Sequence, residues 1–420
     1  MRKKEPVKIA LITGYLGAGK TTLLNHILSN DEGIRAAVIV NDIGEVNVDA
    51  ELIAKGGVVT QENSNLVPLT NGCICCTLRD DLATQLRDLA KTGKFDYIII
   101  EASGICEPIP IAQTIADICE ESTEDGLPMM LDNIIAVVDC ARMHDEFEDG
   151  RSLLKDSYEE EDIENLLIQQ LEFCNTVLLN KVDTVDEYQL GELKAIVKSL
   201  QTKAVIIEAN YAKVKIADVL NTGRFDLESS MESAGWIEAI QNADIEEHDH
   251  DDDDEDEHEH HHHHDDDDDD DDDHHEEHHG HGHHHHHHHH NADVSYQVEE
   301  YGIGSFVYFR RRPFDRDKLV SLAEKWPRSI IRCKGMVWYK QDPSMSYIFE
   351  QAGHLIQEMQ SGRFLASADQ ASIERVLAKY PEVRKMWDEK YGDRMQKLVF
   401  IGQNMDRKEI ERELDECLVD

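Results

Sequence analysis

Short apolar runs alternate with amphipathic stretches between Val7 and Phe225. The apolar runs, rich in Val and Ile, cover residues 9–13, 36–41, 97–100, 134–138, 176–179 and 205–207. Between them, apolar residues recur at helical spacing, as in the leucines at 78, 82, 86 and 89. Continuous apolar runs are typical of strands buried on both faces of a parallel sheet. The alternation therefore predicts a doubly wound α/β domain with a mostly parallel sheet.

A second ordered unit is expected from Val294 onwards. Its predicted strands are residues 303–310, 330–339 and 398–401, and its predicted helices are residues 318–325, 372–380 and 407–418. The spacing is less regular than in the first unit, which favours a smaller α+β domain. We therefore expect domains at 1–228 and 294–420, joined by an acidic, His/Asp-rich and disordered linker at 229–293.

Composition narrows the class of protein. The 420 residues include 87 acidic and 42 basic side chains, a formal net charge of −45, which argues against nucleic acid or an anionic membrane as the main partner. No run approaches the roughly 18 apolar residues that span a bilayer. Nine cysteines are too sparse for a disulfide scaffold, so a reducing cytosol fits best. We expect a cytoplasmic protein that binds neither nucleic acid nor membrane.

A phosphate-binding loop lies between the first strand and a helix. Residues 14–21, Gly-Tyr-Leu-Gly-Ala-Gly-Lys-Thr, match G-x-x-x-x-G-K-[ST] in the required strand–loop–helix context. Backbone N–H groups and the helix N-terminus would bind phosphate, Lys20 would reach the β and γ oxygens, and Thr21 would ligate magnesium. The expected nucleotide-binding residues here are Gly14, Gly17, Ala18, Gly19, Lys20, Thr21 and Thr22.

Two further motifs follow predicted strands. In Asn180-Lys181-Val182-Asp183, the Asp183 carboxylate can accept two hydrogen bonds from guanine that adenine cannot donate, which favours GTP over ATP. Glu101 follows the strand at 97–100, where P-loop enzymes hold an acid near magnesium. We expect Lys20, Thr21 and Glu101 to form the catalytic centre of a GTPase, although no hydrolytic base is evident.

Three thiols are clustered at Cys73, Cys75 and Cys76, just before a predicted helix. A helix N-terminus favours thiolate, and hence zinc, cobalt or cuprous copper. Glu45, in the segment 41–49, is our candidate for the fourth ligand, with a solvated loop acid as the alternative reading. Cys106 could supply sulfur instead, or serve as a small packing residue. The segment 41–49 is also placed like a switch that senses the γ-phosphate.

Together these motifs resemble the CobW family of metal-chaperone GTPases, and the segment 332–338, Arg-Cys-Lys-Gly-Met-Val-Trp, resembles its C-terminal domain. The resemblance implies a GTPase that carries zinc or another transition metal to a client metalloprotein, with Cys73, Cys75 and Cys76 as ligands near the nucleotide. One departure concerns residues 41–44, which read Asn-Asp-Ile-Gly where the family more often has Asn-Glu-Phe-Gly.

A histidine-rich tract separates the two units. Residues 248–290 hold 21 of the 24 histidines, 20 acids and two glycines, a composition that can chelate zinc, nickel or cobalt without fixed geometry. A solvated acidic spacer is the alternative. We expect a GTP-hydrolysing zinc metallochaperone. The alternatives are a nickel or cobalt insertion GTPase and a metal buffer with a regulatory nucleotide site. The sequence leaves a homodimer open.

Overall fold

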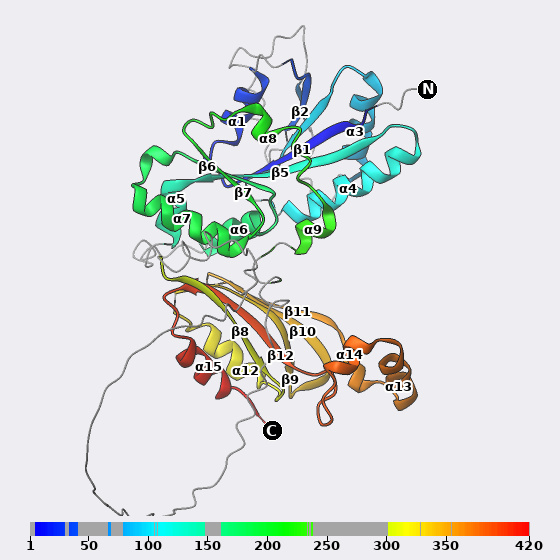
Figure 1. Ribbon diagram of the computed structural model, residues 1–420, viewed down its shortest axis with the longest axis vertical. Helices are drawn as coiled ribbons and strands as arrows, with labels where there is room; N and C mark the ends of the chain where they lie inside the picture. Colours follow the sequence, from blue (N-terminus) through cyan, green and yellow to red (C-terminus); the bar gives the residue numbers. More distant parts are fainter. Residues whose placement is uncertain are drawn as a thin grey trace, which may run out of the picture.

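The computed structural model describes two parts of the chain (Figure 1). The described residues are 5–29, 33–40, 66–68, 79–104, 106, 108–147, 161–232, 234, 237, 301–327, 329–353 and 355–419. The candidate metal ligands Glu45, Cys73, Cys75 and Cys76 lie outside these residues, as do the segment 41–49 and the tract 248–290. Among the helices within the described ranges, none is long and apolar enough to cross a membrane.

The N-terminal part is built on a seven-stranded sheet in the order β3-β2-β4-β1-β5-β6-β7. Every pair of neighbouring strands is parallel, which confirms the predicted parallel sheet. The strands are β1 (Val7–Thr13), β2 (Ala36–Val40), β3 (Leu66–Pro68), β4 (Tyr97–Glu101), β5 (Met129–Asp139), β6 (Thr176–Asn180) and β7 (Val205–Ala209).

Helices cover both faces of this sheet, so the central strands bury alternate residues on opposite sides. In β1, Ile9 and Leu11 belong to one apolar cluster, whereas Ala10 and Ile12 belong to the other. The first cluster includes residues of α3 (Arg79–Thr92), α4 (Pro108–Glu124), α5 (Cys140–Phe147), α6 (Glu161–Glu172) and α7 (Glu187–Leu200). The second includes residues of α1 (Lys20–Leu28) and α8 (Ile216–Val219). The short α9 (Leu227–Glu232) follows. This is the doubly wound arrangement that the alternating pattern predicts.

Two strands at the sheet edges differ from the expectation. The sequence predicts β7 as a buried strand, but β7 is an edge strand and Val205 is 40% exposed. β3 has only three residues and lies at the opposite edge, where the apolar pattern predicts no strand. An edge strand has a neighbour on one side only, so it needs no continuous apolar run.

The C-terminal part is an α+β domain, as expected, with a five-stranded antiparallel sheet in the order β11-β10-β9-β12-β8. Its strands are β8 (Ile303–Arg310), β9 (Ile330–Tyr339), β10 (Asp342–Ala352), β11 (Leu355–Arg363) and β12 (Gln396–Gln403). Its helices are α12 (Arg316–Ala323), α13 (Gln370–Lys379), α14 (Pro381–Lys385) and α15 (Arg407–Asp415). The prediction missed β10 and β11. The helices α12 and α15 pack on one face through Leu319, Ile410 and Leu414.

The other face of the C-terminal sheet packs against the N-terminal part, next to α6 and α7 (Figure 1). Ile331, Val399 and Ile401 of this sheet share one buried cluster with Ile168 and Leu193 of the two helices. The two domains therefore have a common apolar core where they meet.

A buried ion pair lies within that contact. Arg332 of β9 donates from Nε to Glu172 Oε1 (2.8 Å) and from Nη2 to Glu172 Oε2 (3.0 Å). The same Nη2 also donates to Glu350 Oε1 (2.5 Å). The side chains of Arg332 and Glu172 have no exposed surface. Such a pair strongly disfavours any state that leaves one partner buried alone.

Candidate nucleotide site

The phosphate loop occupies the carboxyl end of β1, where the sheet brings the ends of β4, β5 and β6 close to it. Gly14, Gly17 and Gly19 have φ values of 136°, 78° and 111°. A Cβ atom would come within 2.2 Å of the Val137 carbonyl oxygen at Gly14 and within 2.4 Å of Asn180 Nδ2 at Gly19. Only glycine satisfies both the backbone angle and the close approach at these two positions.

Lys20 lies at the start of α1 and is only 7% exposed. Its Nζ donates to the carbonyl oxygens of Gly14 (2.8 Å) and Tyr15 (3.3 Å), so the ammonium group extends back across the loop. A buried cation at a helix N-terminus, among backbone N–H groups, is suited to bind the oxygens of a phosphate.

Thr21 and Glu101 are brought together from positions 80 residues apart. The Thr21 hydroxyl donates to Glu101 Oε1 at 3.4 Å. β4 pairs with β1 so that Glu101 stands beside Ile12, and the Glu101 side chain is buried. A hydroxyl and a carboxylate next to the phosphate loop are the hard oxygen ligands that magnesium prefers.

The guanine motif at the end of β6 is tied to the phosphate loop. Asn180 Nδ2 donates to the Ala18 carbonyl oxygen (2.8 Å), and Asn180 Oδ1 accepts from the Ala212 N–H (2.9 Å). Lys181 adopts φ 60°, and its Nζ donates to Asp139 Oδ2 (2.6 Å). Asp183 follows within two residues and is exposed. The structure therefore brings Asn180 and Lys181 to the same sheet edge as Lys20, Thr21 and Glu101.

The loop after β7 also belongs to this site, and the sequence analysis missed it. Asn210 Oδ1 accepts from the Asp183 N–H (3.1 Å), while Tyr211 and Ala212 adopt φ values of 54° and 52°. Left-handed backbone at non-glycine residues is uncommon and is concentrated at functional sites. The sequence did offer one signal that this loop lies at the site. The loop follows a predicted parallel strand, and the carboxyl ends of parallel strands lie at one common edge of the sheet.

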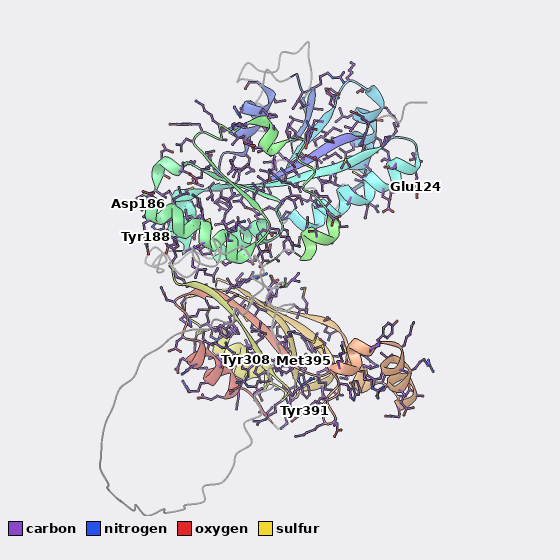
Figure 2. The ribbon with its side chains drawn as sticks, viewed as in Figure 1. Glu124, Asp186, Tyr188, Tyr308, Tyr391 and Met395 are labelled. Atoms are coloured by element: carbon purple, nitrogen blue, oxygen red, sulfur yellow. The ribbon has the colours of Figure 1, made fainter. Side chains whose placement is uncertain are left out.

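The end of β5 contacts the guanine motif, and helix α5, which follows it, contacts the phosphate loop. Asp139, at the end of β5, pairs with Lys181, and the Arg142 guanidinium lies 4.2 Å from the centroid of the Tyr15 ring in the phosphate loop. Beyond the guanine motif, α7 begins near the labelled Asp186 and Tyr188, on the side of the N-terminal domain nearer the C-terminal sheet (Figure 2).

In the sequence, the three cysteines of the metal motif fall between two elements that the structure describes. β3 ends at Pro68, and α3 begins at Arg79. β3 is three strands from β1 in the sheet, which is about 14 Å at the usual strand spacing. The strands between them are β2, which precedes the segment 41–49, and β4, which carries Glu101.

The described cysteines have the properties of core residues. Burial raises the pKa of Cys119, Cys140 and Cys174 to about 12, so these side chains stay protonated at neutral pH. Cys106 is buried in the apolar cluster of the N-terminal domain, which supports its reading as a packing residue. In the described ranges, no group of three or more His, Cys, Asp or Glu side chains is placed to hold a metal ion.

A parallel sheet with this phosphate loop, a buried lysine and an Asn-Lys-x-Asp motif defines a P-loop GTPase. The chain belongs to the CobW family. Residues 8–208 match the family model described as the CobW/HypB/UreG nucleotide-binding domain, and residues 303–418 match the model described as the cobalamin synthesis protein CobW C-terminal domain.

Named relatives match the chain over different lengths. It is 33% identical over 437 residues to "Zinc-regulated GTPase metalloprotein activator 1" of Dictyostelium discoideum, covering 100% of this chain and 81% of that protein. It is 34% identical over 224 residues to "Zinc chaperone CobW" of a Sinorhizobium species, covering 52% of this chain and 63% of that protein. The crystal structure of a Zn(II)-bound YjiA GTPase from E. coli aligns over 99% of this chain and 100% of its own, with 20% identity and a TM-score of 0.39.

Proposed function

We propose that this protein is a GTP-hydrolysing metallochaperone that binds zinc and delivers it to client metalloproteins in the cytoplasm. The observation that supports the proposal is the group of nucleotide-site residues at the carboxyl edge of the sheet, where β3, the strand before the cysteine motif in the sequence, also ends. The names of two relatives, a zinc-regulated GTPase metalloprotein activator and a zinc chaperone, support the choice of metal. Within the proposal, the GTPase domain is 1–228, the His/Asp-rich linker is 229–293 and the CobW-like domain is 294–420.

The roles of the nucleotide-site residues follow from their positions. Lys20 and the backbone N–H groups of the phosphate loop bind the β- and γ-phosphates, with Thr22 in the next position of α1. Asn180 holds the guanine motif on the loop, and Asp183 recognises the base. Thr21 and Glu101 are the residues that would hold magnesium, directly or through water. When bound, magnesium would neutralise part of the charge on the phosphates.

In this proposal zinc is the cargo, and its ligands are Cys73, Cys75 and Cys76 with Glu45 as the fourth. The end of β2, from which the segment 41–49 departs, and Glu101 on β4 both lie between the phosphate loop and β3. A change at the γ-phosphate can therefore reach the metal through either element. Because coupling between two binding sites is reciprocal, magnesium-GTP should tighten zinc binding and zinc should tighten GTP binding.

The proposal is tested by titrating the full-length protein with zinc, and in parallel with cobalt and nickel, in the presence of a non-hydrolysable GTP analogue or GDP. We expect at least about fivefold tighter zinc binding with the analogue. Cys75→Ala should lose that binding, whereas Cys119→Ala, which removes a buried core thiol, should keep it. Equal zinc affinity with both nucleotides would contradict the chaperone mechanism.

The histidine tract can be tested separately. Deletion of residues 248–290 should lower the number of metal ions bound per chain and leave GTP turnover unchanged, because the nucleotide site lies in other parts of the sequence. Absence of turnover in the full-length protein would favour the metal-buffer alternative.

A further inference from the structure

The loop that follows β4 lies directly against the phosphate loop. A Cβ atom added at Gly104 would come within 2.9 Å of the Leu16 backbone nitrogen, and closer still to its side chain. At the start of the same loop, the Ala102 N–H donates to the Ile12 carbonyl oxygen at 2.9 Å. Loops that contact the γ-phosphate in GTPases change position between the GTP and GDP states. A movement of the loop at Gly104 would therefore change its packing against the phosphate loop.

Gln170 of α6 contacts the backbone of this loop. It is only 2% exposed, and its Nε2 donates to the carbonyl oxygens of Gly104 (3.4 Å) and Cys106 (3.5 Å). An amide nitrogen has two hydrogens, one for each carbonyl. Both distances are at the long end of hydrogen bonding, so a small movement of the loop changes their strength.

The same helix is tied to the C-terminal domain two residues later, at Glu172. Residues two positions apart on a helix point about 200° away from each other. Gln170 therefore reaches the loop of the N-terminal domain, while Glu172 forms its two hydrogen bonds with Arg332 of β9. Residues of α6 also lie against β10 and β11.

We propose that Gln170 is a positioning residue for GTP hydrolysis, and that α6 couples the loop after Glu101 to β9 of the C-terminal domain. Gln170 acts through the backbone of Gly104 and Cys106 and does not touch the nucleotide. Glu172 and Arg332 transmit the position of α6, because their buried ion pair allows little independent movement. The inference rests on the proposed GTP hydrolysis and on the proposed magnesium role of Glu101, which immediately precedes this loop, and it requires no bound zinc.

The first test compares two buried glutamines in the full-length protein. Gln170→Met keeps the side-chain length and removes both donors. We expect kcat for GTP hydrolysis and the ratio of GTP to GDP affinity each to fall at least about fivefold. The matched control is Gln396→Met, because Gln396 Nε2 also donates to two carbonyls, those of Trp338 (2.8 Å) and Arg312 (3.0 Å), within the C-terminal domain. The control should lower Tm and leave the affinity ratio unchanged.

Gln170→Asn provides a second variant if the methionine variant does not fold, since the shorter amide cannot reach both carbonyls. An unchanged kcat and affinity ratio in either folded variant would overturn the positioning role, whatever happens to Tm. A role in stability alone would lower Tm without changing the ratio.

The coupling is tested by hydrogen exchange of residues 330–339 with a GTP analogue or GDP, in the absence of zinc. We expect different exchange in the two states, and a smaller difference in Gln170→Met and in Glu172→Gln. Identical exchange in the wild-type protein would overturn the coupling through α6. Zinc affinity is not part of this measurement, so failure here is distinguishable from failure of the chaperone proposal.

Discussion

At the scale of single residues, Asn180 and Asp183 of the guanine motif differ in burial and in their hydrogen bonds. Asn180 is buried and uses both ends of its amide to join Ala18 of the phosphate loop to Ala212 of the loop after β7. The backbone N–H of Asp183 donates to Asn210 Oδ1, and the residue is exposed. This arrangement leaves the Asp183 carboxylate free of the role that Asn180 has in joining the loops, in keeping with its proposed recognition of guanine.

Asp183→Asn should therefore change which base is bound. The amide oxygen of Asn can still accept a hydrogen bond, but its NH₂ group can only donate one. The variant therefore loses the hydrogen bond from guanine's exocyclic amine and gains a hydrogen bond to the carbonyl oxygen that xanthine has in its place. We expect GTP affinity to fall about 10- to 100-fold, as for the loss of a hydrogen bond to a charged group, with a gain in affinity for xanthosine triphosphate. Nucleotide titration measures both. Asp186→Asn, three residues along, is the matched control and should bind GTP as the wild type does.

At the scale of elements, α7 begins shortly after the guanine motif in the sequence and also contacts the C-terminal domain. Asp186 is its N-cap, and a capping box forms because the Asp186 N–H donates to Gln189 Oε1 while Asp186 Oδ1 accepts from the Gln189 N–H. Farther along the helix, Gln403 of β12 donates to Glu192 Oε1 (2.5 Å). The capping box therefore fixes the start of a helix whose middle contacts the C-terminal domain.

Asp186→Ala should lower the free energy of unfolding by about 1 kcal/mol, the usual effect of removing an N-cap. Denaturant unfolding monitored by circular dichroism measures the change. Asp186→Asn should retain most of the stability, since Asn caps helices as well as Asp. Equal destabilisation by both variants would contradict the capping role.

The elements differ in how far the sequence predicts them. The central strands β1, β4 and β6 are buried on both faces, so an apolar run marks each one. β11 was missed because it is an edge strand with mostly exposed residues, and β10 because its burial does not alternate regularly and its pairing with β11 contains a bulge. Strands without a regular apolar pattern are recognisable only from their neighbours.

At the scale of the whole molecule, the buried Arg332 forms a polar link between the domains. It is completely buried between Glu172 of α6 and Glu350 of β10. Arg332→Met should lower the free energy of unfolding by about 3–5 kcal/mol, because it leaves Glu172 buried without its partner. Adding Glu172→Gln should recover part of that loss. Unfolding curves of both variants test this, and Arg79→Met, which removes an exposed ion pair with Glu121, should change stability little.

The same cluster makes a prediction about acid stability. Burial opposes ionisation of Glu350, but attraction to Arg332 and Lys334 outweighs it and lowers the pKa of Glu350 below its ordinary value of 4.5. A lowered pKa in the folded state stabilises the protein above the unfolded pKa, and that contribution is lost as the pH falls through the folded pKa. Unfolding measured between pH 7 and pH 3 should therefore show a loss below about 4.5. Glu350→Gln should reduce this dependence, and an identical pH profile would contradict the prediction.

Sequence alone determined the features that depend on neighbouring residues. The phosphate loop needs glycines, a lysine and a threonine in one short stretch, and the strand–helix alternation follows from local periodicity. Tertiary structure decided which distant groups meet: Thr21 with Glu101, Asn180 with Ala212, Gln170 with Gly104 and Glu172 with Arg332. The physical reason is that strand order and domain docking are set by burial summed over the whole core, which no local pattern contains.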